Sequence, residues 1–235
     1  YLINMKIKNF DYPGKNKVQK IKVITSGGLV PFLFLIFILF YIIYFDNFAY
    51  SEYFLNIPQI RMVPLIILIF LFISFIDDFN YIPFQVRLIF QIILIYLSLS
   101  LFPVNPDYNF QTPIFDGLIP LKIDVVLSII FWIFIINSTN FIDGYDGMFS
   151  FQIITNFFGL SVIFFMIDEI FHFKVSILMF FIGVLFLPFN LGKKFKMYIG
   201  DAGSIPGGFI LGWMIISLIN MGYFFCAILL NILFL

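Results

Sequence analysis

The chain has 235 residues, of which 62% are hydrophobic and 11% are charged, and its 13 basic and 13 acidic side chains give zero net charge. A soluble domain carries about 25% charged residues, so this composition excludes an ordinary water-soluble protein and predicts one that crosses a membrane several times. The zero net charge gives no basis for nucleic-acid binding, and the single cysteine, Cys226, excludes an intrachain disulfide and a thiolate metal cluster.

Apolar runs close to the length that spans a bilayer recur along the chain. The predicted spans are 29–45, 60–76, 85–102, 121–140, 149–167, 175–191 and 205–222, followed by a partial span at 223–235. We therefore expect an all-α, polytopic membrane protein with one transmembrane domain over residues 1–235. The chain starts at Tyr1 with a segment too short to span and stops 13 residues into the last run, so both ends are expected to be cut.

Lysine and arginine set the expected orientation, because the cytoplasmic loops of membrane proteins are enriched in them. The N-terminal segment carries six lysines, so we place it in the cytoplasm and let the spans alternate. The proline-rich stretch 103–120 then forms an external loop. Ten basic residues fall inside (Lys6, Lys8, Lys15, Lys17, Lys20, Lys22, Arg87, Lys193, Lys194 and Lys196) and three fall outside (Arg61, Lys122 and Lys174).

The same orientation places three acidic clusters at cytoplasmic ends of spans, although only basic residues entered the assignment. Asp77 with Asp78, and Asp143 with Asp146, each follow a span, whereas Asp201 precedes one. Charge beside lipid is costly, so acids in such places usually serve a function. Five carboxylates gathered on one basic face predict a shared cation.

The pair Asp77 and Asp78 faces the negative end of a helix dipole, and the two carboxylates repel each other. A metal ion or a cationic partner would remove both penalties, and the plain alternative is a solvated loop. Arg87 and Gln91 are four residues apart, so they share a face of the next predicted helix. Arg87 either pairs with an Asp of the same loop or extends to a lipid phosphate.

The segment NSTNFIDGYDG combines amides and acids at intervals of three residues. Asn137 and Asn140 share a helical face if the helix continues that far, and Asp143 and Asp146 repeat the interval. The glycine after each aspartate permits a turn and the close approach of a ligand. These oxygens suit Mg²⁺, ribose hydroxyls or a uracil edge, and the plain alternative is an Asp-Gly turn between two helices.

The segment GDAGS, residues 200–204, opens the last full span, where Asp201 or Ser204 is placed to cap the helix. A helix start flanked by glycines is also suited to bind an anion. The lysine-rich stretch 193–196 lies just upstream and either holds phosphates or marks the cytoplasmic border. Together the three clusters are components of Mg²⁺-dependent phosphoryl transfer, with a lipid phosphate as acceptor and a soluble nucleotide as donor.

Four segments resemble, in the same order, the motifs of the polyprenyl-phosphate N-acetylhexosamine-1-phosphate transferases, glycosyltransferase family 4. DYPGKNKVQKIKVITSGGL (11–29) is similar to the D-x-P segment and GG-L motif, and IDDFNYIPFQVRLIFQ (76–91) to the aspartate pair with its trailing R-L-x-x-Q. NSTNFIDGYDGM (137–148) is similar to N-x-x-N-x-x-D-G-x-D-G, and PFNLGKKFKMYIGDAGS (188–204) to F-N…F-M-G-D-x-G-S. The family includes phospho-MurNAc-pentapeptide translocase and the enzymes that start O-antigen and common-antigen synthesis.

The resemblance implies that undecaprenyl phosphate attacks the sugar-linked phosphate of a UDP-sugar and that UMP leaves. It places the reaction at the cytoplasmic face of a bacterial inner membrane and implies a homodimer. NFIDGYDG looks closer to the O-antigen-type members, which favours UDP-N-acetylhexosamine over UDP-MurNAc-pentapeptide as donor. The cell-wall and lipopolysaccharide pathways are the two settings that the resemblance implies.

The resemblance also assigns residues. Mg²⁺, with Mn²⁺ as a substitute, would be bound by Asp201 together with Asp77 and Asp78. The catalytic set would be Asp77, Asp78, Asp143 and Asp201, with one acid of the pair contacting the metal or deprotonating the lipid phosphate. The residues that would contact the substrates are Arg87, Asn137, Asn140, Asp146, Asn190, Lys193, Lys196 and Ser204.

Three features depart from the family pattern. The His-rich loop beyond GD-x-GS and the first family helix are not in this chain, and VITSGGL stands where a Pro-rich approach is usual. The only histidine, His172, falls on the external side. A second interpretation is therefore a catalytically impaired fragment or homologue that acts as a membrane binder or scaffold. An ion-coupled transporter is a third, although its acids would lie near the bilayer midplane instead of at span ends.

Overall fold

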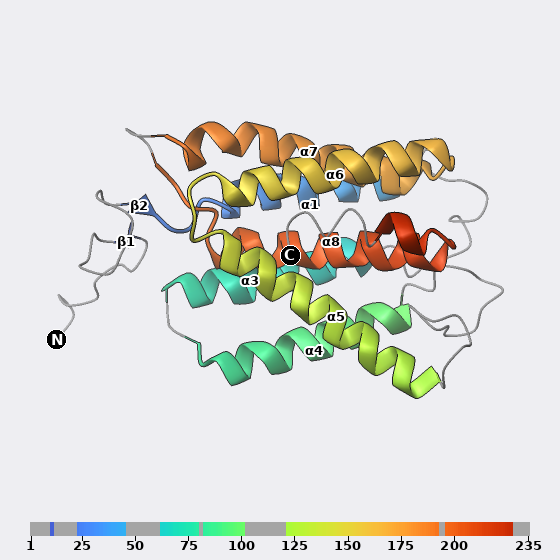
Figure 1. Cartoon of the computed structure of the whole chain (residues 1–235). Helices are drawn as coiled ribbons and strands as arrows, with labels where there is room; N and C mark the ends of the chain where they lie inside the picture. The colour runs from blue at the N-terminus through green and yellow to red at the C-terminus, as the bar shows by residue number, and fades with distance from the viewer. Residues whose placement is uncertain are drawn as a thin grey trace.

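The computed structural model describes residues 10–11, 23–45, 62–79, 82–101, 121–192 and 196–227 (Figure 1). Two strands of two residues, β1 (Phe10–Asp11) and β2 (Val23–Ile24), pair antiparallel. The helices are α1 (Leu29–Phe45), α3 (Val63–Phe79), α4 (Phe84–Leu101), α5 (Leu121–Ile142), α6 (Met148–Met166), α7 (Ile170–Asn190) and α8 (Asp201–Asn220). The predicted external loop 103–120 and the candidate substrate contact Lys193 lie outside the described residues.

The prediction of an all-α polytopic membrane protein is confirmed. Each full predicted span corresponds to one helix, and four of the described helices (α5, α6, α7 and α8) are long and apolar enough to cross a membrane. Helices α7 and α8 begin at Ile170 and Asp201, earlier than the predicted residues 175 and 205. Their first turns contain polar residues, which hydropathy excludes from a span although they are helical. The sequence does not predict the β1–β2 ribbon.

Helix α8 lies at the centre of the bundle, and every residue from Ala202 to Ile219 is buried. It packs most extensively against α5 and α3, and it also contacts α6 and α1. Figure 1 shows α8 between the α6–α7 layer and α4. Its many small residues, among them Gly203, Ser204, Gly207, Gly208 and Gly212, allow neighbouring helices to approach closely, which favours a central position.

Small residues let α5 approach α8 closely, as is common between membrane helices. Gly208 faces the backbone of Ile136, and Gly212 lies against the indole ring of Trp132. The Trp132 Nε1 donates a hydrogen bond of 2.9 Å to the carbonyl oxygen of Phe209. The Trp132 and Phe209 rings stack with their centroids 5.0 Å apart, so the indole fixes the register of the two helices.

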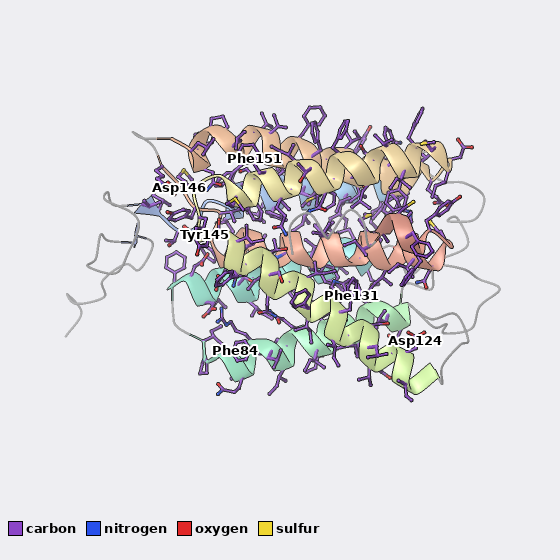
Figure 2. All side chains as sticks on the ribbon, viewed as in Figure 1. Phe84, Asp124, Phe131, Tyr145, Asp146 and Phe151 are labelled. Atoms are coloured by element: carbon purple, nitrogen blue, oxygen red, sulfur yellow. The ribbon has the colours of Figure 1, made fainter. Side chains whose placement is uncertain are left out.

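The helix ends bring the acidic clusters to one end of the bundle. The ends of α3 and α5 and the starts of α1, α4, α6 and α8 lie beside the β1–β2 ribbon, at the left of Figure 1. Asp146 lies at this end, whereas Asp124, in the first turn of α5, lies at the opposite one (Figure 2). This arrangement agrees with the alternating direction of the spans that the lysine and arginine distribution predicts. The cytoplasmic location of this end stays a prediction.

Replacing Gly212 by alanine should destabilise the protein, because the added Cβ would overlap the Trp132 ring. Overpacking of this kind costs about 1–3 kcal/mol. The matched control is Gly207→Ala in the same helix, where the nearest atom, on the Phe32 ring, lies 3.3 Å away. Thermal unfolding in detergent should therefore occur at a lower temperature for Gly212→Ala than for Gly207→Ala. Equal melting temperatures would contradict this packing of α5 on α8.

Candidate active site

The candidate site forms around the segment Met197–Ala202, which leads into α8. Gly27 and Gly28 donate their backbone N–H groups to the carbonyl oxygens of Tyr198 and Ile199, at 3.1 and 2.7 Å. A parallel bridge between β2 and the same segment continues this pairing. The turn before α1 and the approach to α8 therefore lie side by side, although they are far apart in the sequence.

Glycines make this close contact sterically feasible. A Cβ on Gly28 would lie 2.6 Å from the backbone nitrogen of Gly203, and a Cβ on Gly200 would overlap the carbonyl oxygen of Thr25. Gly200 also has a φ of 71°, which side-chain-bearing residues rarely adopt. The GG-L and GD-x-GS motifs are thus the two halves of one glycine contact.

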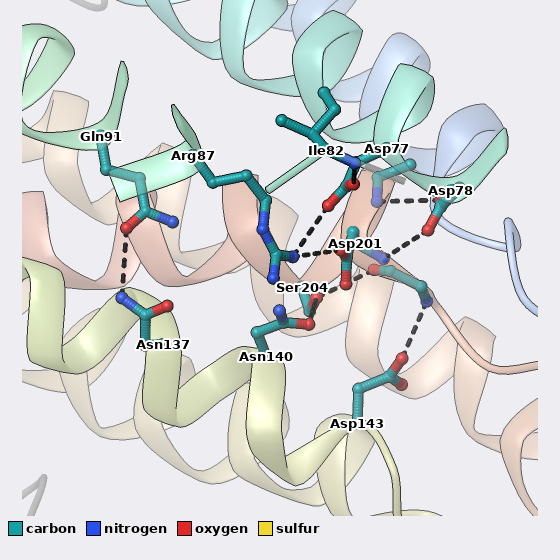
Figure 3. Close-up of polar contacts among 12 residues, drawn as sticks. Asp77, Asp78, Ile82, Arg87, Gln91, Asn137, Asn140, Asp143, Asp201 and Ser204 are labelled. Atoms are coloured by element: carbon teal, nitrogen blue, oxygen red, sulfur yellow. Dashed lines mark hydrogen bonds and ion pairs between the residues drawn. The ribbon is translucent and has the colours of Figure 1, made fainter. Parts of the chain in front are cut away.

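Two carboxylates from other elements bind the backbone at the start of α8 (Figure 3). Asp78, in the last turn of α3, accepts hydrogen bonds from the N–H groups of Asp201 at 3.1 Å and Ala202 at 3.2 Å. Asp143, between α5 and α6, accepts bonds of 3.2 and 2.8 Å from the N–H groups of residues 199–200. Four consecutive backbone donors are therefore bonded to carboxylate oxygens.

These bonds occupy the anion site that the sequence predicts at this helix start. The N-cap residue is Gly200, which has no side chain to cap the helix. Asp201 does not cap it, and the Ser204 hydroxyl donates to the carbonyl oxygen of Gly200 instead. Any phosphate bound to these N–H groups would have to displace Asp78 or Asp143.

Asp143 is only 6% exposed. Burial raises the pKa of its carboxyl group to about 7, because a charge is poorly solvated there, and the nearby Asp201 adds to the rise. The N–H groups of Gly200 and Ile199 act in the opposite direction, since they stabilise the ionised form. The carboxylate of Asp143 therefore depends on these two donors for its charge.

Arg87, on α4, lies between carboxylates from two other helices. Its Nη1 is 2.8 Å from Asp77 Oδ2 on α3 and 2.8 Å from Asp201 Oδ2 on α8. Asp77 Oδ1 also accepts the N–H of Ile82 at 2.6 Å, which closes the turn between α3 and α4. The interpretation that Arg87 pairs with an Asp of the same loop is confirmed. Asp201, 114 residues away, is its second partner.

Asn137 and Asn140 lie one turn apart on α5, which continues to Ile142 as their predicted shared face requires. The Asn137 Nδ2 donates to Gln91 Oε1 on α4 at 3.1 Å. The hydroxyl of the fully buried Ser204 on α8 shares its one proton between Asn140 Oδ1 at 2.8 Å and the Gly200 carbonyl oxygen at 2.9 Å. The two amides thus connect α5 to both neighbouring helices behind the acidic cluster.

Asp146 belongs to a separate polar group at the rim. Its Oδ2 lies 2.5 Å from Lys196 Nζ, and its Oδ1 accepts from the Tyr198 hydroxyl at 3.0 Å. Its side chain is 48% exposed, in contrast to the other acids. Asn190, at the end of α7, is fully buried and donates to the carbonyl oxygen of Met197 at 3.3 Å. Asn190 therefore supports the segment that carries this rim group.

Sequence reasoning missed Tyr198 as a member of the site. It follows Lys196 by two residues in an extended segment, and this spacing puts both side chains on one side of the chain. Gln91 was recognised only as a neighbour of Arg87 on one helical face. Its contact with Asn137 depends on how α4 packs on α5, which spacing does not reveal.

Asp77 and Asp201 are the acids whose positions fit a divalent cation. No group of three His, Cys, Asp or Glu side chains converges as a preformed cage within the described residues. The carboxylates of Asp77 and Asp201, however, converge on one nitrogen of Arg87, so they already face a positive charge. A pair of this kind suits Mg²⁺, which binds one or two carboxylates and completes its shell with water and substrate phosphate.

Comparisons with known proteins point to one family. The profile of glycosyl transferase family 4 matches residues 60–219. The phospho-N-acetylmuramoyl-pentapeptide-transferase of Staphylococcus epidermidis is 30% identical over 172 residues, 65% of this chain and 53% of that protein. Those of Staphylococcus haemolyticus and Staphylococcus aureus are 28% and 29% identical over 159 residues, 62% of this chain and 49% of each relative. The chain spans about half the length of the curated relatives it matches.

Replacing Gly200 by alanine should displace the segment before α8, because the new Cβ would overlap Thr25 and the φ of 71° would be strained. We expect a lower melting temperature in detergent. The control is Gly144→Ala at the same end of the bundle, whose Cβ would meet one atom, the carbonyl oxygen of Phe141, at 3.5 Å. If Gly200→Ala unfolds at the same temperature as Gly144→Ala, the described glycine contact is wrong.

Proposed function

The chain belongs to glycosyl transferase family 4, and on this premise we propose that it transfers a sugar phosphate from a UDP-sugar to a polyprenyl phosphate. An oxygen of the lipid phosphate attacks the sugar-linked phosphorus, the bond between the two donor phosphates breaks, and UMP leaves. The observation that carries the proposal is the convergence of Asp77 and Asp201 on Arg87 at one end of a membrane bundle.

Phosphoryl transfer depends on positioning and on neutralising charge, and the cluster offers groups for both. Asp77 and Asp201 would hold Mg²⁺, which when bound offsets the negative charge of the donor diphosphate. The planar guanidinium of Arg87 suits contact with a phosphate group. A phosphate monoester loses its second proton near pH 6, so the acceptor needs little help from a base.

The rim group would bind the nucleotide half of the donor. Lys196 offers a positive charge to a phosphate, and Asp146 offers oxygens to ribose hydroxyls or to the uracil edge. Asp146 is more exposed than the acids of the Arg87 cluster, whereas the Lys196 side chain is largely covered, and both belong to the same end of the bundle. Lys193, outside the described residues, stays a candidate from the sequence alone.

Two donors are candidates. The NFIDGYDG segment (140–147) favours a UDP-N-acetylhexosamine. The relatives are phospho-N-acetylmuramoyl-pentapeptide-transferases, which makes UDP-N-acetylmuramoyl-pentapeptide the second candidate. We propose the first, at the cytoplasmic face of a bacterial inner membrane and in a homodimer. Comparing turnover of the two donors by one preparation decides between them.

An enzyme accounts for the acids better than a transporter does. Asp77, Asp78, Asp143 and Asp201 lie at helix ends on one side of the bundle, whereas a transporter site is expected near the bilayer midplane. A scaffold could use the same ion pairs to hold α3, α4 and α8 together. The measurement of turnover separates the enzyme from the scaffold.

Asp201→Asn should lower turnover by about 100-fold, the usual effect of removing an electrostatic group that acts in the transition state. The assay is Mg²⁺-dependent formation of lipid-linked sugar from UDP-N-acetylglucosamine by the purified protein in nanodiscs. Asp168→Asn is the matched control, because Asp168 is exposed, lies between α6 and α7, and has a φ of 59° that asparagine tolerates. Wild-type turnover by Asp201→Asn, or turnover that survives chelation of divalent ions, would refute the metal assignment.

Lys196→Met should raise the KM for the UDP-sugar about tenfold, the cost of one lost charge-assisted hydrogen bond. The KM for the polyprenyl phosphate should stay unchanged, because the acceptor is assigned to Arg87. Steady-state kinetics with each substrate varied in turn give both KM values for the same variant, so the acceptor KM is the control for the donor KM. A rise in the acceptor KM alone would show that the two substrate sites are assigned the wrong way round.

A further inference from the structure

We propose that Asp78 and Asp143 are positioning residues, which fix the start of α8 so that the Asp201 carboxylate faces Arg87. They do so by binding backbone N–H groups and contact neither the metal nor the substrates. The part of this proposal that concerns turnover rests on the proposed function, whereas the structural part does not.

The four N–H groups of residues 199–202 need partners because they lie at the start of a buried helix. The first N–H groups of a helix have no acceptor within it, and a local Ser, Thr, Asp or Asn usually provides one. Here the N-cap is Gly200, which cannot. The acceptors come instead from Asp78, 123 and 124 positions away along the chain, and from Asp143, 56 and 57 positions away.

The neighbours Asp77 and Asp78 have different surroundings. Successive residues of a helix point about 100° apart, so one acid of the pair faces Arg87 and the other faces the backbone of α8. Both oxygens of Asp78 are used by N–H groups, and the same holds for Asp143. The Oδ2 atoms of Asp77 and Asp201 face Arg87 instead.

The bonds act on Asp201 directly, because its own N–H is one of the four donors. In Figure 3, Asp78 lies above and Asp143 below the start of α8, and Arg87 lies to the left of it. The backbone at Asp201 is thus held by Asp78 while its carboxylate contacts Arg87. A site of this kind requires its ligands to be held within about 0.5 Å, which explains why buried charges are retained here.

The test is hydrogen–deuterium exchange of the peptide spanning residues 197–204, measured by mass spectrometry on the purified protein in detergent. An asparagine at position 78 or 143 keeps one acceptor oxygen but turns its NH₂ group toward the second N–H. Asp78→Asn and Asp143→Asn should therefore speed exchange in this peptide about tenfold or more. The matched control is Asp77→Asn, whose side chain binds none of these N–H groups and which should leave the exchange unchanged.

The second readout is the Mg²⁺ concentration that gives half-maximal turnover. A positioning role predicts that it rises in Asp78→Asn and Asp143→Asn together with the faster exchange. A direct metal contact would raise it without changing exchange, and that result would overturn the proposal. A general loss of folding would speed exchange in α6 and α7 as well and leave the Mg²⁺ requirement of the folded fraction unchanged, which would also overturn it.

A measurement on the wild-type protein tests the proposal even if the variants do not fold. Fragmentation that resolves single amides should show slow exchange at Asp201 and Ala202, which would exchange fast in an uncapped helix. Fast exchange at both would refute the capping by Asp78. Because exchange does not depend on turnover, an inactive protein would refute the proposed function and leave this inference standing.

Discussion

The site depends on the carboxylates of Asp78 and Asp143 binding four consecutive N–H groups at the start of α8. A buried backbone donor without a partner is costly, so the central helix can begin at Asp201 only if these acceptors are present. The same bonds tie α3 and the α5–α6 loop to α8. The backbone bonds from Gly27 and Gly28 hold the segment before α8 from the side of α1.

This constraint explains why so many acids lie beside lipid at one end of the bundle. The backbone of α8 stabilises the ionised form of Asp78 and Asp143, and Arg87 pairs with Asp77 and Asp201. The cluster therefore separates into a pair that binds the backbone of α8 and a pair that faces Arg87. For the proposed phosphoryl transfer, this division would keep the metal ligands rigidly held.

Much of this follows from the sequence. Hydropathy predicted the helices, and the lysine distribution placed Asp77, Asp143 and Asp201 at one end, because span length and charge bias act independently of packing. The division between Asp77 and Asp78 did not follow, since it depends on the rotation of α3 against α8. The caps at Asp78 and Asp143 also escaped prediction, because local capping rules examine only neighbouring residues.

The measurement that tests the account most directly is the fate of the sugar-linked phosphate. A UDP-sugar carrying radioactive phosphorus at that position is incubated with the purified protein, Mg²⁺ and a polyprenyl phosphate. The account predicts that the label appears in the lipid product and that unlabelled UMP is released in equal amount. Label retained in released UDP would mean that the sugar alone is transferred, and it would contradict the assignment of the site.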